Sequence, residues 1–383
     1  MDFSFNEDQN AIRDLASQIF TDRTTDEFMM GFSRAGHTYD DALWSTLAEA
    51  GLLGITVPEE FGGTGLGFTE LCLMLEEQGR RISPVPLYAN LVLGALPIAE
   101  FGTAAQKAKY LTPLATGKLK LTAAIAELGI SPAAAGQVSA SRQGDSWTLT
   151  GTLACVPDSP VADAIIVPTT TAHGTTVFIV DTQQSGVRVD AQFSSLGENE
   201  GELILDKVEL DASSIIGTAD EGHIVLDWLE LRAETALCAL QLGVTEEALK
   251  RTAAFTCERK QFGAAIGTFQ AVAMQAADAF IDVEAIRSTY WLALYKLNSK
   301  QDARAEVRCA KWYVADAGHR IVYRTQHLHG GMGVDLDYPI HRFFLWAKHL
   351  GMMLGGRSVQ ISKLGALLAS DDSVGIAALQ IQA

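Results

Sequence analysis

The chain has 383 residues, of which 48% are hydrophobic and 20% charged; this composition excludes a disordered chain and allows a sizeable core in about two or three domains. A formal net charge of −17 argues against non-specific nucleic-acid binding, although paired arginines or a helix N-terminus can still hold a diphosphate. The five cysteines are widely spaced, which is typical of reduced, mostly buried thiols rather than of disulfides or a zinc site.

Membrane and export signals are not evident in the sequence. The apolar segment 90–99 stops short of the roughly 18 residues that span a bilayer, and it carries Pro97. The first residues show no basic region followed by an apolar stretch, as a secretory signal would. We therefore expect a cytoplasmic protein without a membrane span.

Residues 1–120 are predicted to be helical. Apolar side chains recur at three- and four-residue spacing, as at Ile12, Leu15 and Ile19. Residues 51–67 are rich in glycine and carry a proline, so they predict a loop between helices, which by itself would be a compact turn system.

The remainder of the chain divides into a β-domain and a second helical region. Residues 121–221 contain short β-branched segments bounded by Gly, Asp, Ser and Pro, which predict strands at 147–151, 164–167, 176–180 and 203–205. From residue 222 to 383 helical periodicity returns in the segments 226–249, 271–297, 304–328 and 343–368.

The first motif with chemical content is Cys-Glu-Arg-Lys-Gln-Phe-Gly at 257–263, followed by Thr-Phe-Gln-Ala at 268–271. Gly263 is a natural helix stop and Gln270 lies near the start of the next helix. Arg259 is therefore expected beside two helix ends, where free backbone groups bind anions. Such a corner suits a diphosphate, whereas an isolated Arg-Lys pair would be an ordinary charged turn.

The second motif is His-Leu-His-Gly-Gly-Met-Gly at 327–333, followed by Tyr338, Pro339 and Arg342. Paired glycines allow a backbone to approach a ligand closely because no Cβ stands in the way. Two histidines at this spacing raise the question of a metal site, but no third ligand follows at a clear spacing, so we predict none.

The loop at 51–67, the corner at 257–271 and the Gly-Gly segment at 327–333 together resemble the acyl-CoA dehydrogenases, and the resemblance covers essentially the whole chain. It implies an α+β fold with an N-terminal helical domain (1–120), a middle β-barrel-like domain (121–221) and a C-terminal four-helix bundle (222–383). It also implies an FAD-dependent oxidoreductase that desaturates an acyl-CoA thioester at its α,β bond.

The resemblance further implies which residues contact FAD. In the family, the corner and the Gly-Gly segment reach the cofactor of the neighbouring subunit. The implied contacts are Arg259, Gln261, Phe262, Phe269, Gln270, His327, Gly330 and Gly331. At His327 the family usually has Gln, and an imidazole can still donate a hydrogen bond.

Parts that the family uses for its own flavin ring and thioester are missing. Family members carry an acidic, Ser/Thr-rich loop where this chain has residues 126–133, and a Trp-Ile-Thr/Ser-Asn stretch where this chain has residues 153–158. In this chain neither segment has the aromatic wall or the hydroxyl donor that the family shows. The resemblance therefore implies that this chain retains contacts made to a neighbour's FAD and has lost those made to its own.

The catalytic base is missing as well. Family members place a glutamate before a Gly-Thr, where this chain has Leu354 and then Gly-Gly, or on the first helix after the β-domain, where it has Ala233. Neither side chain can take a proton from a carbon acid. Glu230 and Glu234 are fallback candidates for the base, but neighbouring helix residues point in different directions, so a charged helix face is expected there.

The missing base, the Leu-Gly-Gly at 354–356 and the segment 334–344 are similar to non-catalytic partner subunits of heterotetrameric bacterial acyl-CoA dehydrogenases of steroid side-chain β-oxidation. The resemblance implies an α2β2 assembly with a glutamate-bearing paralogue, a bulky acyl-CoA substrate and an electron acceptor such as electron-transfer flavoprotein. Two alternatives stay open: a homotetrameric acyl-CoA dehydrogenase with a relocated base, and a non-enzymatic acyl-CoA-binding scaffold.

Overall fold

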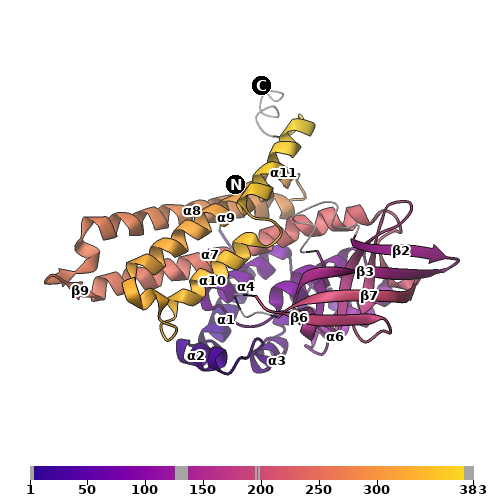
Figure 1. Ribbon diagram of the computed structural model, residues 1–383, viewed down its shortest axis with the longest axis horizontal. Coiled ribbons are helices and arrows are strands. Elements are labelled where there is room, and N and C mark those ends of the chain that lie inside the picture. The colour runs from indigo at the N-terminus through magenta and orange to yellow at the C-terminus, as the bar shows by residue number, and fades with distance from the viewer. Residues whose placement is uncertain (1–3, 126–136, 195, 197–198, 375–383) are drawn as a thin grey trace. The chain divides into compact units, whose positions relative to one another are not determined.

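The structure, a computed structural model, describes residues 4–125, 137–194, 196 and 199–374 (Figure 1). The chain divides into two compact units. One consists of Met1–Arg34, Cys72–Ser83 and Glu234–Ala383, and the other of Ala35–Leu71 and Pro84–Ala233.

The N-terminal segment is helical, as predicted. Its α-helices are α1 (Glu7–Arg23), α2 (Asp26–Arg34), α3 (Asp41–Glu49), α4 (Phe68–Arg81), α5 (Leu96–Phe101) and α6 (Ala104–Ala115). Capping boxes start two of them, with Asn6 and Gln9 at α1 and Thr103 and Gln106 at α6. The predicted loop contains the 3-10 turns η1 (Leu52–Gly54) and η2 (Glu59–Phe61), and a π-helix, η3 (Tyr88–Ala95), precedes α5.

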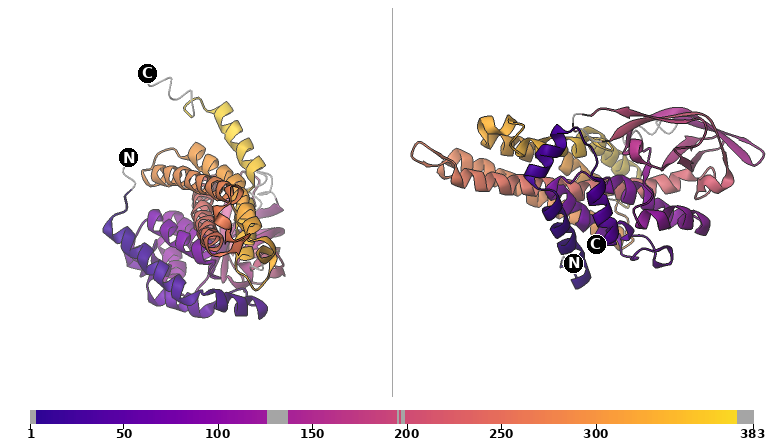
Figure 2. Two further views of the ribbon diagram at one scale, coloured as in Figure 1. Left: turned by 90° about the vertical axis from the view of Figure 1, so that its left-hand side faces the viewer. Right: turned by 90° about the horizontal axis from the view of Figure 1, so that it is seen from below.

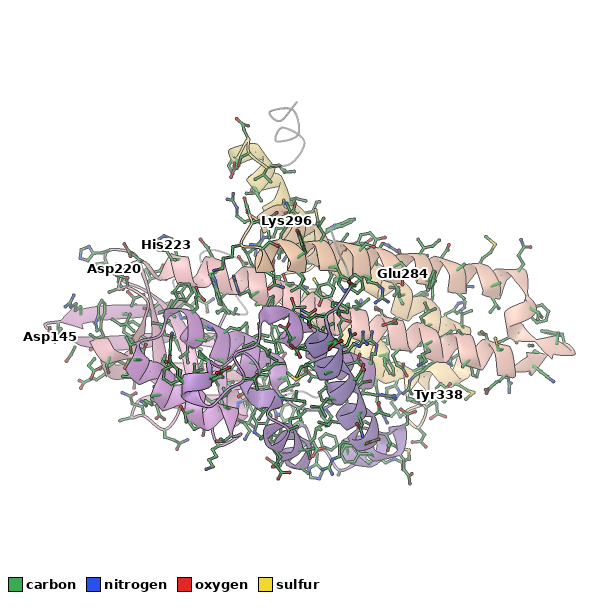
Figure 3. The ribbon with its side chains drawn as sticks, turned by 180° about the vertical axis from the view of Figure 1, so that it is seen from behind. Asp145, Asp220, His223, Glu284, Lys296 and Tyr338 are labelled. Carbon is green, nitrogen blue, oxygen red and sulfur yellow. The ribbon has the colours of Figure 1, made fainter. Side chains whose placement is uncertain are left out.

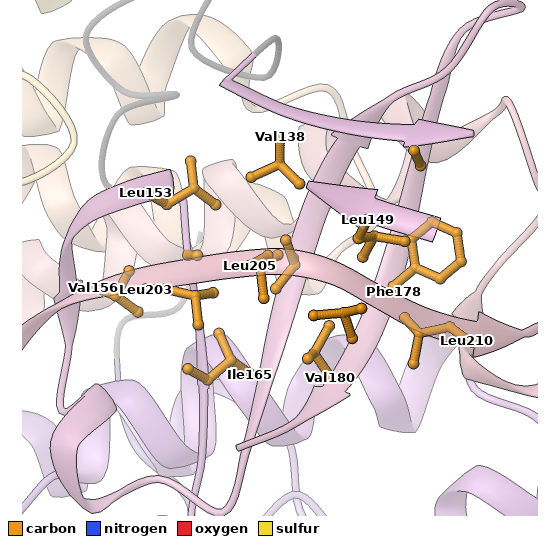
Figure 4. Packing of buried hydrophobic residues seen from close by; sticks show 14 of the residues in the cluster. Val138, Leu149, Leu153, Val156, Ile165, Phe178, Val180, Leu203, Leu205 and Leu210 are labelled. Carbon is orange, nitrogen blue, oxygen red and sulfur yellow. The ribbon is translucent and has the colours of Figure 1, made fainter. Parts of the chain in front are cut away.

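The middle segment forms a mixed sheet in the order β6-β7-β3-β2-β4-β5-β8, with β1 paired to β4. The strands are β1 (Leu121–Ala123), β2 (Val138–Gln143), β3 (Ser146–Pro157), β4 (Ala164–Thr170), β5 (Thr175–Asp181), β6 (Val187–Gln192), β7 (Glu200–Asp211) and β8 (Ile215–Ile216), with 3-10 turns η5 (Ser159–Val161) and η6 (Ala212–Ser214). All four predicted β segments lie within these strands. Alternate apolar side chains such as Leu149, Ile165 and Leu203 meet in a buried core (Figure 4).

The C-terminal segment is helical again. It contains α7 (Gly222–Glu258), α8 (Gln270–Asn298), α9 (Arg304–Leu328), α10 (Ile340–Met352) and α11 (Arg357–Ser370), joined in part by β9 (Lys260–Gln261), β10 (Ala264–Ala265), η7 (Ile266–Thr268) and η8 (Gly330–Val334). Helix α9 packs against α8, α10 and α11 (Figures 1 and 2). No helix of the described part of the chain is long and apolar enough to cross a membrane.

One helical prediction was wrong. The segment 343–368 was expected to be continuous, but it is divided between α10 and α11. Leu354 and Gly355 have left-handed φ angles of +53° and +94°, which no α-helix can accommodate. We call residues 353–356 the α10–α11 corner.

Candidate functional site

A β-hairpin between α7 and α8 displays Phe262. Gln261 pairs with Ala264, which leaves Phe262 and Gly263 as a two-residue turn with φ angles of +53° and +82°. Two positive φ angles match the twist of a tight hairpin, but they strain a bulky residue such as phenylalanine. The ring is 96% exposed. A strained and exposed aromatic side chain is expected where another molecule covers it.

Arg259 lies at the base of this hairpin. Its backbone is fixed, because its N–H donates to the carbonyl of Phe255 at 2.8 Å and its carbonyl accepts from the N–H of Ile266 at 2.8 Å. Its side chain is exposed. Phe269, at the start of α8, is also exposed and makes an edge contact with Phe262 at 6.3 Å between ring centroids.

The glycine pair after α9 faces open space. A Cβ added at Gly330 or Gly331 would meet no heavy atom of the described residues within 4 Å, and both residues are exposed. Packing within this chain therefore gives no reason for two glycines. Gly330 has a left-handed φ of +59°, which favours glycine whatever the space around it. No such conformation accounts for Gly331, where the missing Cβ leaves room for close approach of a ligand or of another chain.

The structure places the second motif against α7 and α8, the helices that flank the first motif. His327 on α9 lies 3.3 Å from the side-chain oxygen of Gln275 on α8 through its Nδ1 atom. His329 stacks on Phe255 near the end of α7, with ring centroids 4.4 Å apart. We call the exposed predicted contacts the helix-end surface; they are Arg259, Gln261, Phe262, Phe269, Gln270, His327, Gly330 and Gly331.

His329 is internal rather than part of this surface. It is buried, and its Nδ1 atom lies 2.7 Å from the carbonyl of Thr325, to which it donates. Burial lowers its pKa, so the neutral ring is favoured. Within the described ranges no group of three or more His, Cys, Asp or Glu side chains could hold a metal ion.

The two positions of the family's base are buried and apolar. Leu354 is 4% exposed and Ala233 is 0% exposed. Leu354 holds the left-handed conformation described above, so its side chain occupies the corner at a conformational cost. Nothing at either position can accept a proton.

The expectation of a charged helix face at Glu230 and Glu234 was wrong for Glu234. Its side chain is 0% exposed and forms an ion pair with Arg308 of α9. One of its oxygens also accepts a 2.7 Å hydrogen bond from the side-chain amide of Gln360. The sequence concealed this, because the pairing residues come from helices far along the chain. Glu230 is half-buried.

Gln360 links Glu234 to the α10–α11 corner. The same amide nitrogen donates to the carbonyl of Leu354 at 3.0 Å. Arg308 and Gln360 belong to no motif, so the sequence analysis missed both, and only their place in regular helices could be anticipated. The side chain of Gln360 thus connects Glu234, the fallback base, to Leu354, which stands where the family normally has its base. The charge of Glu234 is compensated by Arg308.

A cavity of about 540 Å³ lies beside the same corner, between α9, α10 and the start of α11. Its polar lining includes Asp316, His319, Lys348 and Arg357. Lys348 Nζ lies 3.2 Å from His319 Nδ1, and Arg357 pairs with Asp316 at 3.0 Å. Burial, Lys348 and Arg357 all lower the pKa of His319, which keeps its ring neutral.

The predicted flavin-ring side is only partly described. Residues 126–133 lie outside the described residues. At 153–158, the N–H of Cys155 donates to the side-chain oxygen of Gln192 at 2.8 Å, so this backbone donor is satisfied within the sheet. Asp158 has a pKa raised to about 7 by burial and then by Glu200. No aromatic ring or hydroxyl stands at Cys155 or Pro157.

Comparison with known proteins gives consistent matches. The family models "Acyl-CoA dehydrogenase, N-terminal domain" and "Acyl-CoA dehydrogenase, C-terminal domain" match residues 6–118 and 231–368. Acyl-CoA dehydrogenase FadE27 of Mycobacterium tuberculosis is 34% identical over 378 residues, covering 96% of this chain and 99% of FadE27.

Two solved structures are similar over nearly their whole length. A variant of the Tcur3481-Tcur3483 steroid ACAD has 42% identity and a TM-score of 0.88, covering 96% of this chain and 99% of that one. The ChsE4-ChsE5 complex from Mycobacterium tuberculosis has 35% identity and a TM-score of 0.91, covering 97% and 100%.

Proposed function

Since this chain belongs to the acyl-CoA dehydrogenase family, we propose that it is the partner subunit of a heterotetrameric, FAD-dependent acyl-CoA dehydrogenase. Enzymes of the family oxidise a CH–CH bond of an acyl-CoA, and FAD is their cofactor. When bound, FAD accepts the hydride that leaves the substrate. This chain would help to hold that cofactor in a neighbouring subunit.

The observation that carries the proposal is a contrast in exposure. The helix-end surface is exposed, and its glycines leave open space, while Leu354 closes the position of the base. Arg259 fits the diphosphate of FAD because a guanidinium binds phosphate oxygens through two parallel hydrogen bonds. Phe262 offers an aromatic face to the same neighbour. These residues fit the role of holding FAD in trans.

The proton step is assigned to the partner. Abstraction of the α-proton requires a carboxylate placed against the substrate. Leu354 and Ala233 supply none, and the charge of Glu234 is compensated by Arg308. A glutamate-bearing paralogue would provide the base in the α2β2 assembly.

The relatives support both the assembly and the substrate class. The ChsE4-ChsE5 and Tcur3481-Tcur3483 structures are each named for two components, and the second is named as a steroid enzyme. By this likeness we propose a bulky acyl-CoA, such as a steroid side-chain thioester, and an acceptor such as electron-transfer flavoprotein.

A second candidate is a homotetrameric acyl-CoA dehydrogenase in which Glu234 is the base. Its burial and its link to Leu354 through Gln360 favour this reading. The cavity beside the corner also favours it, because Lys348 and Arg357 in its lining could contact an anionic part of the chain's own FAD. The non-enzymatic scaffold has no comparable support.

Flavin counting in the native assembly tests the proposal. The complex should be purified from the natural host, its subunits identified, and its FAD measured per subunit after denaturation. Fewer FAD molecules than subunits, together with a glutamate-bearing paralogue, is the expected result. One FAD per subunit in an assembly of this chain alone would establish the homotetramer instead.

A further inference from the structure

Helix α2 is held in an unusual way. It has nine residues, of which Met29 is the buried one, and a helix this short is not stable by itself. Ion pairs hold both of its ends. Both carboxylate oxygens of Asp26 accept hydrogen bonds from Arg251, at 2.7 and 2.9 Å, and Arg34 pairs with Asp337 at 2.5 Å.

The Asp26 end of α2 is bound to the last turns of α7, which lead to the β9–β10 hairpin and which we call the first arm. Arg251 lies on α7, about two turns before Arg259. It is further held by Glu247 at 2.9 Å and lies 5.0 Å from the centroid of the Phe343 ring. Burial lowers the pKa of Arg251, but Asp26 and Glu247 outweigh this and raise it overall, so the charged pair is maintained.

The Arg34 end of α2 is bound to the segment between η8 and α10, which follows Gly330 and Gly331 and which we call the second arm. Asp337 lies between η8 and α10, and its N–H donates to the side chain of Asp335 at 3.0 Å. The next residue, Tyr338, lies 5.2 Å from the His329 ring, which itself stacks on Phe255 of α7 (Figure 3 marks Tyr338). Helix α2 therefore contacts both arms that carry the helix-end surface.

We propose that α2 is a strap that sets the spacing between Arg259 and the Gly330–Gly331 loop, and that Asp26 and Arg34 are positioning residues for FAD bound in trans. The inference rests on the proposed function, which places FAD against both segments. A ligand gripped by two separate segments is bound tightly when they are pre-positioned, because less ordering is needed on binding. Releasing one end of α2 leaves the two segments less ordered before FAD binds. Binding must then order them, so FAD is bound more weakly.

A simple structural role makes a different prediction. If α2 only stabilises the fold, loss of an ion pair lowers the melting temperature and leaves FAD affinity unchanged. Loss of an exposed ion pair changes an equilibrium by roughly fivefold at most, so a larger loss of FAD affinity requires an effect on the position of the FAD-binding segments.

The test uses the native complex with Asp26→Asn or Arg34→Asp in this chain. FAD dissociation is followed by flavin fluorescence, and kcat and KM are measured in parallel. We expect FAD binding about fivefold weaker or more in each variant. The double variant Arg34→Asp with Asp337→Arg should restore it, since both side chains are exposed, by 62% and 59%, and can exchange charges.

The matched control is Arg188→Gln on β6, which removes an exposed ion pair with Asp190 of comparable exposure, 66% and 48%. FAD binding should not change in this variant. Unchanged FAD binding in the Asp26 and Arg34 variants, in a complex where Arg259→Ala does weaken it, would overturn the strap and leave the proposed function standing. Unchanged binding in Arg259→Ala as well would overturn both.

Discussion

The helix-end surface and the α10–α11 corner differ in the exposure of their side chains. At the helix-end surface, Arg259 and Phe262 face outward, although the turn that displays Phe262 is strained. At the α10–α11 corner, Leu354 is closed in, and the nearby charge of Glu234 is compensated inside the chain by Arg308. The first region exposes side chains that can bind a ligand, and in the second neither Leu354 nor Ala233 can accept a proton. The division of labour between subunits that we propose would account for both.

The most demanding test of this difference is whether the α10–α11 corner of this chain supplies a catalytic base. We expect Glu234→Gln and Glu230→Gln in this chain to leave dehydrogenation by the full complex within a few-fold of wild type. The equivalent change at the partner's catalytic glutamate should reduce turnover roughly 10²-fold to 10⁴-fold, as loss of a general base does. Steady-state kinetics of complexes with equal FAD content and intact assembly check this. A collapse of turnover in the Glu234→Gln complex would promote the homotetramer reading.

The buried ion pair can be tested by stability instead of activity. Glu234→Gln should lower the free energy of unfolding by about 3–5 kcal/mol, because it leaves the Arg308 charge uncompensated. Replacing both residues with apolar ones should cost much less than the single change. Denaturant unfolding of the chain measures both, with Arg188→Gln as the control for an exposed pair. Equal and small effects in all three variants would mean that the pair is not buried in solution.

The helix-end surface can be tested through FAD. Arg259→Ala in this chain should weaken FAD retention by the complex by about 1.5–3 kcal/mol, the usual contribution of a charge-assisted hydrogen bond. Arg259→Lys should recover part of it, since an ammonium keeps the charge and loses the paired geometry. Because the side chain is exposed, the melting temperature of the isolated chain should stay the same. Equilibrium dialysis of FAD against each complex distinguishes a cofactor contact from a structural turn.

The smallest expected effect concerns the hairpin turn. Phe262→Gly should stabilise the isolated chain by up to about 1 kcal/mol, because glycine adopts a positive φ without strain. The same change should weaken assembly with the partner, which loses an aromatic contact. Thermal unfolding and analytical ultracentrifugation measure the two quantities separately. A destabilised isolated chain would show that the ring packs internally, contrary to its 96% exposure.

Local patterns predicted much of the fold. Helical periodicity identified α7, α8 and α9, and β-branched segments identified strands within β3, β4, β5 and β7. Both depend on neighbours a few residues apart, which the sequence displays directly. The motif at 257–263 indicated a helix end near Arg259, because glycine acts on its local backbone, and α7 ends at Glu258. The break between α10 and α11 escaped prediction, since Leu354 adopts a left-handed conformation that its own side chain disfavours.

The sequence by itself determined the α+β organisation, the family resemblance and the absence of a carboxylate at positions 233 and 354. Only the tertiary structure decided that Glu234 is internal, because its hydrogen bond to Gln360 joins residues 126 positions apart and its ion pair comes from a third helix. Only the tertiary structure, likewise, attached α2 to both arms of the helix-end surface, since Asp26 and Arg251 lie 225 positions apart. Burial and charge compensation depend on which helix faces meet, and a periodic pattern on one helix does not specify its neighbour.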